Sequence, residues 1–334
     1  IGIKGGFHVP EYLGSKATFT LGQFGGHAGR NLLIGDMLAI TEYSSDQSKS
    51  LAADQIPKFA RHWEIAVMYG PHGAPDFFTK NDIDRFFSNQ FEIHYNSSRT
   101  GIRLIGPKPE WAREDGGEAG LHPSNIHDNA YAIGAIDFTG DMPIILGPDG
   151  PSLGGFVCPA VVIHSELWKI GQLKAGDKVK FIPVSYAQAK VLDHTYHQSF
   201  IASDTDEVNF NPVFHAENDT LENAVLATRV GQAHLPSVTY RPAGNSYLLV
   251  EYGDLVLDLN LRFRIHALMQ WVKEQNIHGI IDLTPGIRSL QIHFDSIQID
   301  QLELLEKLQR AEAELPDIHN MQVPSRTVYL PLAW

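Results

Sequence analysis

A nine-residue pattern that occurs twice in the chain favours β structure. Residues 32–40 and 173–181 both have the form Leu-x-x-Gly-Asp-x-apolar-x-apolar, and residues 251–258 carry a looser copy around a Gly-Asp pair. Gly-Asp is typical of a tight turn, and an apolar residue at every second position places one face of a strand against a core. The pattern therefore predicts β units of similar design in different parts of the chain.

The middle of the chain adds further strand signals. Short apolar segments predict strands at residues 60–69, 91–95, 101–105, 142–146 and 161–163. One helix is expected among them at residues 79–87, where Thr79 is the cap and Asp82 completes a capping box. This part of the chain is therefore expected to be mainly β.

The last third of the chain predicts strands that alternate with helices. Strands are expected at residues 246–251, 255–259, 289–293 and 328–330. One helix has apolar residues at helical spacing from Leu261 to Val272, and a second, with Asp295 as its cap, has them from Leu302 to Leu308. This order predicts a small α/β sandwich.

These signals divide the chain into four parts. Residues 1–45 are expected to end one β domain, residues 46–185 to form a second, and residues 236–334 to form the α/β domain. Residues 186–235 are polar, rich in histidine and poorly periodic, which predicts a long connection. The chain starts at Ile1 in sequence typical of a domain interior, so we expect it to be part of a longer polypeptide.

Composition excludes several classes of protein. The 334 residues carry a formal net charge of −13, which argues against a nucleic-acid surface. No apolar run approaches the roughly 20 residues that span a bilayer. The single cysteine, Cys158, lies in apolar sequence, which predicts a buried inert thiol and a reducing, cytoplasmic compartment. His194 and His197 have no third ligand nearby, so no metal site is expected.

A loop rich in glycine and proline follows the strand predicted at residues 142–146. It runs from Gly147 to Phe156 and contains one carboxylate, Asp149. Turns of this composition fix the backbone at a strand end, and glycine lets backbone N–H groups approach a ligand closely. Gly150, Gly154 and Gly155 are therefore candidate ligand contacts, although a plain connecting loop would have the same composition.

A second set of polar residues precedes this loop. Arg99 and Arg103 are four residues apart on an extended segment, which predicts that both point to one face. Arginine offers paired donors, asparagine a donor and an acceptor, and aspartate acceptors. With the residues Asn125, Asp128, Asn129 and Asp141, they would suit a small amide-like molecule. Ordinary Arg–Asp ion pairs would explain the arginines equally well.

Several of these segments together resemble the carboxyltransferase region of the urea carboxylase family. The resemblance is carried by residues 99–107, 123–129, 147–156, 168–177, 238–244 and 283–290. It extends over nearly the whole chain and is weakest in the connection. The broader family includes the paired subunits of bacterial 5-oxoprolinase.

The resemblance implies a fold and an activity. The fold would be mainly β with α/β, with cyclophilin-like β barrels followed by a small α/β sandwich and with the family's final barrel absent. The reaction would transfer a carboxyl group from carboxybiotin to urea, giving allophanate. Biotin would be held by a separate carrier domain, and ATP and Mg by a separate biotin carboxylase domain. This part alone would be inactive.

The resemblance and the chemistry together suggest site residues. Expected catalytic residues are Asn125, Asp149 and Asp141, which would hold urea or accept from its nitrogens. Expected substrate-binding residues are Arg99, Arg103, Asp128, Asn129, Gly150, Gly154 and Gly155. Donors among them would stabilise charge on an oxyanion. Arg288 could instead serve packing between the halves.

Two other functions remain open at this stage. One is a fused 5-oxoprolinase-type subunit that acts on a cyclic amide without biotin. The other is a binding module that regulates a partner kinase. The loop at residues 147–156 resembles that of urea carboxylase more closely than that of the oxoprolinase type, which favours urea carboxylase over the first of these.

Overall fold

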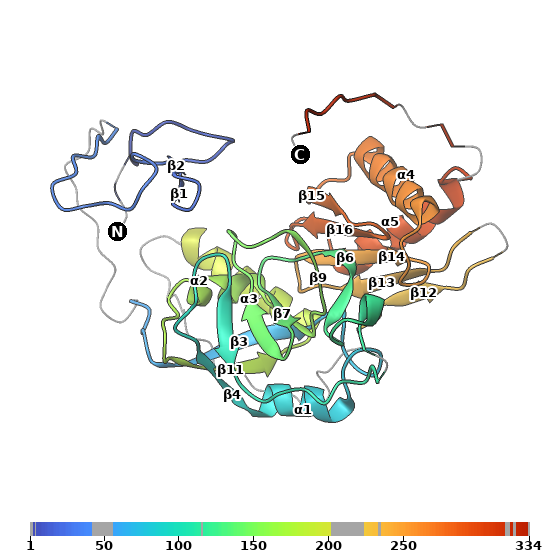
Figure 1. Cartoon of the computed structure of the whole chain (residues 1–334), viewed down its shortest axis with the longest axis horizontal. Helices are drawn as coiled ribbons and strands as arrows, with labels where there is room; N and C mark the ends of the chain where they lie inside the picture. The colour runs from blue at the N-terminus through green and yellow to red at the C-terminus, as the bar shows by residue number, and fades with distance from the viewer. Residues whose placement is uncertain are drawn as a thin grey trace. The chain divides into compact units, whose positions relative to one another are not determined.

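The computed structural model describes residue 3 and residues 5–41, 56–114, 116–201, 224–232, 235–317, 321–322 and 325–332, without the side chains of residue 128 and residues 199–201 (Figure 1). The chain divides into two compact units, Ile1–Ile56 and Pro57–Trp334. Each unit is considered by itself below.

The first unit has little regular structure. Strand β1 (Thr18–Phe19) pairs with β2 (Phe24–Gly25), and Phe7 forms an isolated bridge with Ile40. The prediction of a strand after the Gly-Asp pair at residues 35–36 is wrong, because the described residues that follow form no strand and pair only through the bridge at Ile40. Their alternating side chains lack a core to cover, since Met37 is 87% exposed.

The second unit begins with a closed seven-stranded barrel, in the order β10-β3-β11-β4-β5-β8-β7. All five strands predicted for this part are confirmed, because their alternating apolar side chains fill the barrel. The strands are β3 (His62–Tyr69), β4 (Gln90–Ile93), β5 (Ile102–Ile105), β7 (Ala135–Thr139), β8 (Met142–Ile145), β10 (Ala160–Val162) and β11 (Lys178–Pro183).

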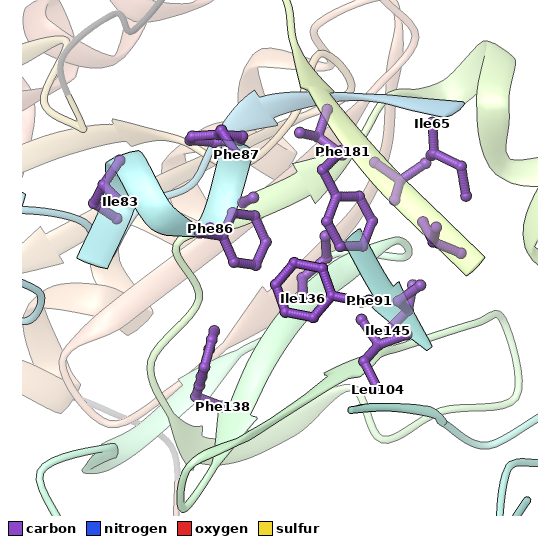
Figure 2. Close-up of a cluster of buried hydrophobic side chains, with 14 of the residues drawn as sticks. Ile65, Ile83, Phe86, Phe87, Phe91, Leu104, Ile136, Phe138, Ile145 and Phe181 are labelled. Carbon is purple, nitrogen blue, oxygen red and sulfur yellow. The ribbon is translucent and has the colours of Figure 1, made fainter. Parts of the chain in front are cut away.

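Aromatic side chains fill the barrel, as Figure 2 shows. The rings of Phe86 and Phe181 are stacked with centroids 5.2 Å apart. Phe86 comes from helix α1 (Lys80–Ser88), whose buried face packs on β11. The predicted capping box is confirmed, since the Thr79 hydroxyl accepts from the N–H of Asp82 and the Asp82 carboxylate accepts from the N–H of Thr79, both at 3.1 Å.

An antiparallel hairpin of β6 (Asn125–Ala130) and β9 (Leu153–Phe156) lies outside the seven barrel strands. The sequence predicts a loop at β9 because two of its four residues are glycine. At Gly155 a side chain would come within 2.6 Å of the carbonyl oxygen of Ile126 on β6, so glycine permits this close pairing. Three short helices, η1 (Glu118–Gly120), η2 (His164–Glu166) and α2 (Leu167–Ile170), complete this part.

The predicted α/β sandwich is confirmed. Five strands form a sheet in the order β12-β13-β14-β16-β15. Helices α4 and α5 share one apolar core with this sheet, and Figure 1 shows them along it. The elements are β12 (Ala227–Arg229), β13 (Val238–Pro242), β14 (Tyr247–Tyr252), α4 (Leu259–Gln275), β15 (Ile280–Pro285), β16 (Ser289–Phe294) and α5 (Gln301–Glu314).

Three local predictions in this domain are wrong. Residues 255–259 form no strand, because Asp258 caps α4 there. The cap of α5 is Asp300, whose carboxylate accepts from the N–H of Leu302 at 2.9 Å, and Asp295 instead closes the turn before it. Residues 328–330 have no sheet partner in the described part of the chain, and Leu330 is 82% exposed.

The segment expected as a connection, residues 186–235, contains regular structure. Helix α3 (Tyr186–Ile201) occupies its start and β12 lies near its end. The helix was not expected because its polar residues are distributed around it without an apolar stripe. Residues 202–223 of this predicted connection lie outside the described residues. The boundaries between the four predicted parts of the chain stay predictions.

Candidate functional site

A cavity of about 230 Å³ lies over the barrel strands β5, β8 and β7 and beside β9. Its wall includes Arg103, Ile144 and Asp137 from the barrel and Gly154 and Phe156 from β9. Ile102, Ile145, Ile136 and Phe138 alternate with these barrel residues and belong to the core. The cavity therefore lies on the outer face of the barrel.

Arg103, Ile144 and Asp137 form a row across three neighbouring strands. Arg103 is directly opposite Ile144, and Ile144 is directly opposite Asp137. Since adjacent strands are about 4.8 Å apart, the backbones of Arg103 and Asp137, two strands apart, are separated by about 10 Å on one face of the sheet. The row thus places a cationic donor and a carboxyl group on either side of an apolar floor.

Asp137 is the least expected residue of this cavity. Its side chain is 2% exposed, and neither carboxyl oxygen has a hydrogen-bond partner among the described residues. Burial raises the pKa of Asp137 well above its usual range. The sequence signal that could have found it is a single carboxylate inside the apolar run at residues 135–138.

Cys158 lies beside Asp137 in the interior. Its thiol donates to the carbonyl oxygen of Ala160 at 3.2 Å, and burial raises the pKa of Cys158 well above its usual value. The predicted buried and inert thiol is confirmed by this burial and this pKa direction.

Gly154 brings Tyr131 to the same cavity. A Cβ atom at Gly154 would lie 2.5 Å from the Tyr131 ring, so any larger residue would displace the ring. The hydroxyl oxygen of Tyr131 accepts from the N–H of Phe156 at 2.8 Å, which fixes the ring against β9. The space at this predicted ligand contact is thus filled by Tyr131.

A second cavity, of about 540 Å³, contains two further predicted residues. The Nε of Arg99 lies 3.1 Å from a carboxylate oxygen of Asp149, and Ser98 lines both cavities. The prediction that Arg99 and Arg103 share a strand face is wrong. Arg99 lies in the turn between Ser98 and Gly101, before β5 begins.

The remaining loop glycine, Gly150, packs against the protein itself. A side chain at Gly150 would come within 3.0 Å of the carbonyl oxygens of Gly147 and Thr100. The N–H of Gly150 donates to the carbonyl of Gly147 at 2.9 Å. This turn holds Asp149 beside Arg99.

Asp141 is placed apart from both cavities. Its carboxylate is 2.7 Å from the Lys108 ammonium and 3.3 Å from the His122 ring, and it accepts from the Trp111 indole at 3.0 Å. Partial burial raises the pKa of Asp141, but the bonds from Lys108 and Trp111 outweigh it and leave the pKa below its usual value. Its catalytic role stays a prediction.

The asparagines of β6 have different surroundings. The backbone carbonyl oxygen of Asn125 accepts from the Arg113 guanidinium at 2.8 Å, and the side chain of Asn125 is half-buried. Asn129 is buried, and its amide oxygen accepts from the Ser289 hydroxyl of the α/β domain at 3.3 Å. The side chain of Asp128 lies outside the described part, so its role stays a prediction.

Arg288 belongs to a buried cluster in the α/β domain. Glu251 accepts from Arg241 at 2.5 Å and from Arg288 at 2.6 Å. Arg241 also donates to the carbonyl of Pro71, beside the barrel, at 3.1 Å. Burial raises the pKa of Glu251, but the two arginines outweigh it and lower the pKa to about 2. The partners of Arg288 itself all lie within the α/β domain, so its packing between the halves stays a prediction.

His72 adjoins this cluster, and its burial predicts that the chain loses stability in acid. Burial lowers the pKa of His72 to about 3, against the opposing charge of Glu251. Between pH 6.5 and 3 the unfolded chain therefore binds a proton that the folded chain does not. His72 should lower the free energy of unfolding by about 1.4 kcal/mol per pH unit as the pH falls through this range.

Guanidinium unfolding of the wild type and of His72→Asn at pH 7 and pH 5 measures this contribution. Asparagine keeps an acceptor for the N–H of Cys158, which His72 Nδ1 accepts at 3.1 Å. We expect the variant to lose about 2 kcal/mol less than the wild type between the two pH values. Parallel losses would show that His72 does not control this pH dependence.

Metal sites and membrane spans are both absent from the part of the chain that the structure describes. No cluster of three or more His, Cys, Asp or Glu that could hold a metal occurs among these residues. His194 and His197 are exposed on α3. None of the described helices has the length and apolar composition needed to cross a membrane.

Comparison with known families defines the class of protein. Residues 1–183 match the family model "Carboxyltransferase domain, subdomain A and B", and residues 238–334 match "Carboxyltransferase domain, subdomain C and D". The chain therefore belongs to the carboxyltransferase domain family. This confirms the family resemblance and the mainly β fold with an α/β domain.

Individual relatives within this family show how similar the chain is to particular proteins. The chain is 44% identical over its whole length to a urea amidolyase of Saccharomyces cerevisiae, of which it covers 19%, and 36% identical to a putative urea carboxylase of Emericella nidulans, of which it covers 29%. It superposes on the crystal structure of Kluyveromyces lactis urea carboxylase with a TM-score of 0.85 and 44% identity, covering 93% of this chain and 29% of that one. The chain thus spans less than a third of these relatives.

Proposed function

We propose that this chain is part of the carboxyltransferase of a biotin-dependent urea carboxylase, which transfers a carboxyl group from carboxybiotin to urea and yields allophanate. The observation that carries the proposal is a pair of cavities that share Ser98, each with an arginine and an aspartate at its wall. Two adjacent sites suit a reaction between two molecules that must meet. The names of the relatives support the choice of urea.

The larger cavity fits a biotin group delivered by a separate carrier domain. Its apolar wall includes Ile102, Trp168 and Leu173, which suits a saturated bicyclic ring. Arg99 and Asp149 at its wall offer donors and acceptors to a ureido group. The bound group would supply the carboxyl group on a ureido nitrogen. ATP and Mg would act in a separate biotin carboxylase domain.

The residues of the chain have defined tasks in this scheme. The urea nitrogen that gains the carboxyl group loses one proton, and Asp149 is the proposed acceptor. Arg99, held 3.1 Å from Asp149, would donate to an oxygen on which negative charge develops. Asn125 lines neither cavity but is opposite Phe156, which lines the smaller one, and it would orient urea through its side-chain amide. Asp141 would act from outside the cavities. Enclosure of both reactants would keep water from the labile carboxyl group.

Alanine substitutions in the full-length polypeptide test the proposal. Asp149→Ala and Asn125→Ala should each lower urea-dependent allophanate formation on the order of 10- to 100-fold. ATP-dependent carboxylation of biotin should stay intact, because it would occur in another domain. Both activities are measured on the same preparation with labelled bicarbonate.

Asp84→Ala is the matched control, since Asp84 is an exposed aspartate on α1. It should leave both activities unchanged. Wild-type rates of allophanate formation in both site variants would refute the assigned roles. A full-length polypeptide that carries no biotin and makes no allophanate would refute the proposed function itself.

A protein of the 5-oxoprolinase type is the second candidate. The chain is 27% identical to one of the 5-oxoprolinase subunits of Haemophilus influenzae, over 57% of each chain. Size and streptavidin binding of the full-length polypeptide on one blot separate the candidates. A very large biotinylated band supports urea carboxylase, and a small band without biotin supports action on a cyclic amide.

A further inference from the structure

The barrel and the α/β domain have separate apolar cores, and the apolar cluster between them is built mostly from small side chains. Its members are Ala132, Ala135, Cys158 and Val161 beside the barrel and Ala243 and Tyr247 in the α/β domain. Ala224 and Leu255 add contacts to the barrel core. Interfaces of this composition allow two domains to move relative to each other. Polar contacts are therefore needed to hold one arrangement, and those of Arg241 and Ser289 described above are two of them.

Helix α3 supplies a larger set of such contacts because it touches both domains. It follows the barrel strand β11, and Ala189 and Leu192 pack on the outer face of β3. Tyr186, Lys190 and Asp193 are four and three residues apart, which places them on one face of the helix. All three are bonded to the α/β domain.

Asp193 is the centre of this face. Its side chain is 4% exposed, and one carboxylate oxygen accepts from the N–H of Ser165 in η2 at 2.9 Å. The other oxygen accepts from the amide of Asn245, in the turn between β13 and β14, at 2.7 Å and from the hydroxyl of Ser296, in the turn before α5, at 3.3 Å. The ring of His164, also in η2, lies 3.7 Å from that oxygen. One buried carboxylate thus joins the barrel side to two separate turns of the α/β domain.

Two further bonds hold the start of α5. The Tyr186 hydroxyl accepts from the N–H of Gln301 at 2.9 Å, and the Lys190 ammonium donates to the Asp300 carboxylate at 2.6 Å. Gln301 is 2% exposed, so the contact keeps water from this N–H. The groups that meet across this face are polar, and water can replace their partners when they separate. Opening of the contact therefore costs much less than exposing an apolar core.

We propose that Tyr186, Lys190 and Asp193 form a clamp that holds the α/β domain on the barrel, and that the domain opens away from the barrel when the clamp is released, while both cores stay folded. Asp193 is the main contact, because it is the one residue of the three whose hydrogen bonds reach both domains. A carboxylate that is satisfied by three donors requires one arrangement of them, so the clamp fixes the position of the domain more strictly than small apolar side chains do. The clamp does not depend on the reaction proposed above.

Amide hydrogen exchange of the full-length polypeptide, read at single residues, tests the clamp. Asp193→Ala should raise the exchange rate of the Gln301 N–H about tenfold or more, although that N–H is bonded to Tyr186 and not to residue 193. The N–H groups of Phe181 in the barrel and Val250 in the α/β sheet should keep their wild-type rates, because both cores stay folded.

A second variant and a control keep the test decisive. Lys190→Met removes the ammonium that contacts Asp300 and keeps the stem of a half-buried side chain, so it should fold even where Asp193→Ala does not. It should raise the exchange rate of the Ser165 N–H about threefold or more, although that N–H is bonded to Asp193. His194→Ala replaces an exposed residue of α3 and should leave both rates unchanged.

The rates distinguish the clamp from a general structural role. Faster exchange at Gln301 with unchanged rates in both cores supports the clamp. An unchanged rate at Gln301 in a folded Asp193→Ala protein would overturn it, because the domain would then be held by other contacts. Equal acceleration in both cores would also overturn it, since Asp193 would then stabilise the whole fold.

Discussion

Replacing Glu251 by alanine should lower the free energy of unfolding by about 3–5 kcal/mol, since it would leave two arginines buried without their counter-charge. Glu251 is 4% exposed, and the side chains of Arg241 and Arg288 are 12% and 10% exposed. Each arginine donates to a different carboxylate oxygen of Glu251. Water therefore cannot replace the lost partner at either guanidinium. Guanidinium unfolding of the chain at neutral pH measures the loss.

Two control variants distinguish the buried charge from a general effect of losing a glutamate. Glu274→Ala removes an exposed glutamate of α4 in the same domain and should change stability by less than about 0.5 kcal/mol. Glu251→Gln keeps the volume but not the charge, so most of the loss should persist. A loss below about 1 kcal/mol for Glu251→Ala would show that the arginines find other partners.

The position of this cluster gives it a second effect. Arg241 also donates to the carbonyl of Pro71, and Asn129 of β6 accepts from Ser289 of β16. These bonds connect the α/β domain to the segments around the barrel. Loss of Glu251 should therefore weaken the attachment of β6 as well as the α/β core. Under the proposed function, carboxyl transfer would then fall further than biotin carboxylation in the full-length polypeptide.

Local sequence rules predicted the elements whose determinants lie within a few residues. The box of Thr79 and Asp82 fixes the start of α1 by itself, and the barrel strands show their apolar periodicity. The hairpin of β6 and β9 was missed because pairing between segments distant in the sequence, and not propensity, makes a strand of Leu153–Phe156. The strand predicted at residues 328–330 fails for the opposite reason, since it has propensity but no described partner.

The candidate site was only partly predictable for a similar reason. Sequence spacing suggested that Arg99 and Arg103 act together, but a turn separates them into two cavities. Asp149 reaches Arg99 only because Gly150 permits a tight turn in a distant part of the sequence. Asp137 was missed because a lone carboxylate in an apolar strand has meaning only once its burial and missing partners are known.

Replacing Phe181 by alanine should lower the free energy of unfolding by about 3–5 kcal/mol. Phe181 is fully buried on β11, stacked on Phe86 of α1 and 5.6 Å from the ring of Phe91 on β4 (Figure 2). The ring thus holds together a barrel strand, its neighbour and the helix that packs on them. Rings that meet from three elements cannot all move inward, so a cavity would remain.

Guanidinium unfolding of the chain measures this loss and compares it with two control variants. Phe181→Leu keeps most of the volume and should cost less than half as much, because the cost of core truncation rises with the size of the cavity left behind. Tyr329→Ala removes an aromatic side chain that is 91% exposed and should cost less than about 0.5 kcal/mol. Equal losses for alanine and leucine at position 181 would contradict a cavity effect.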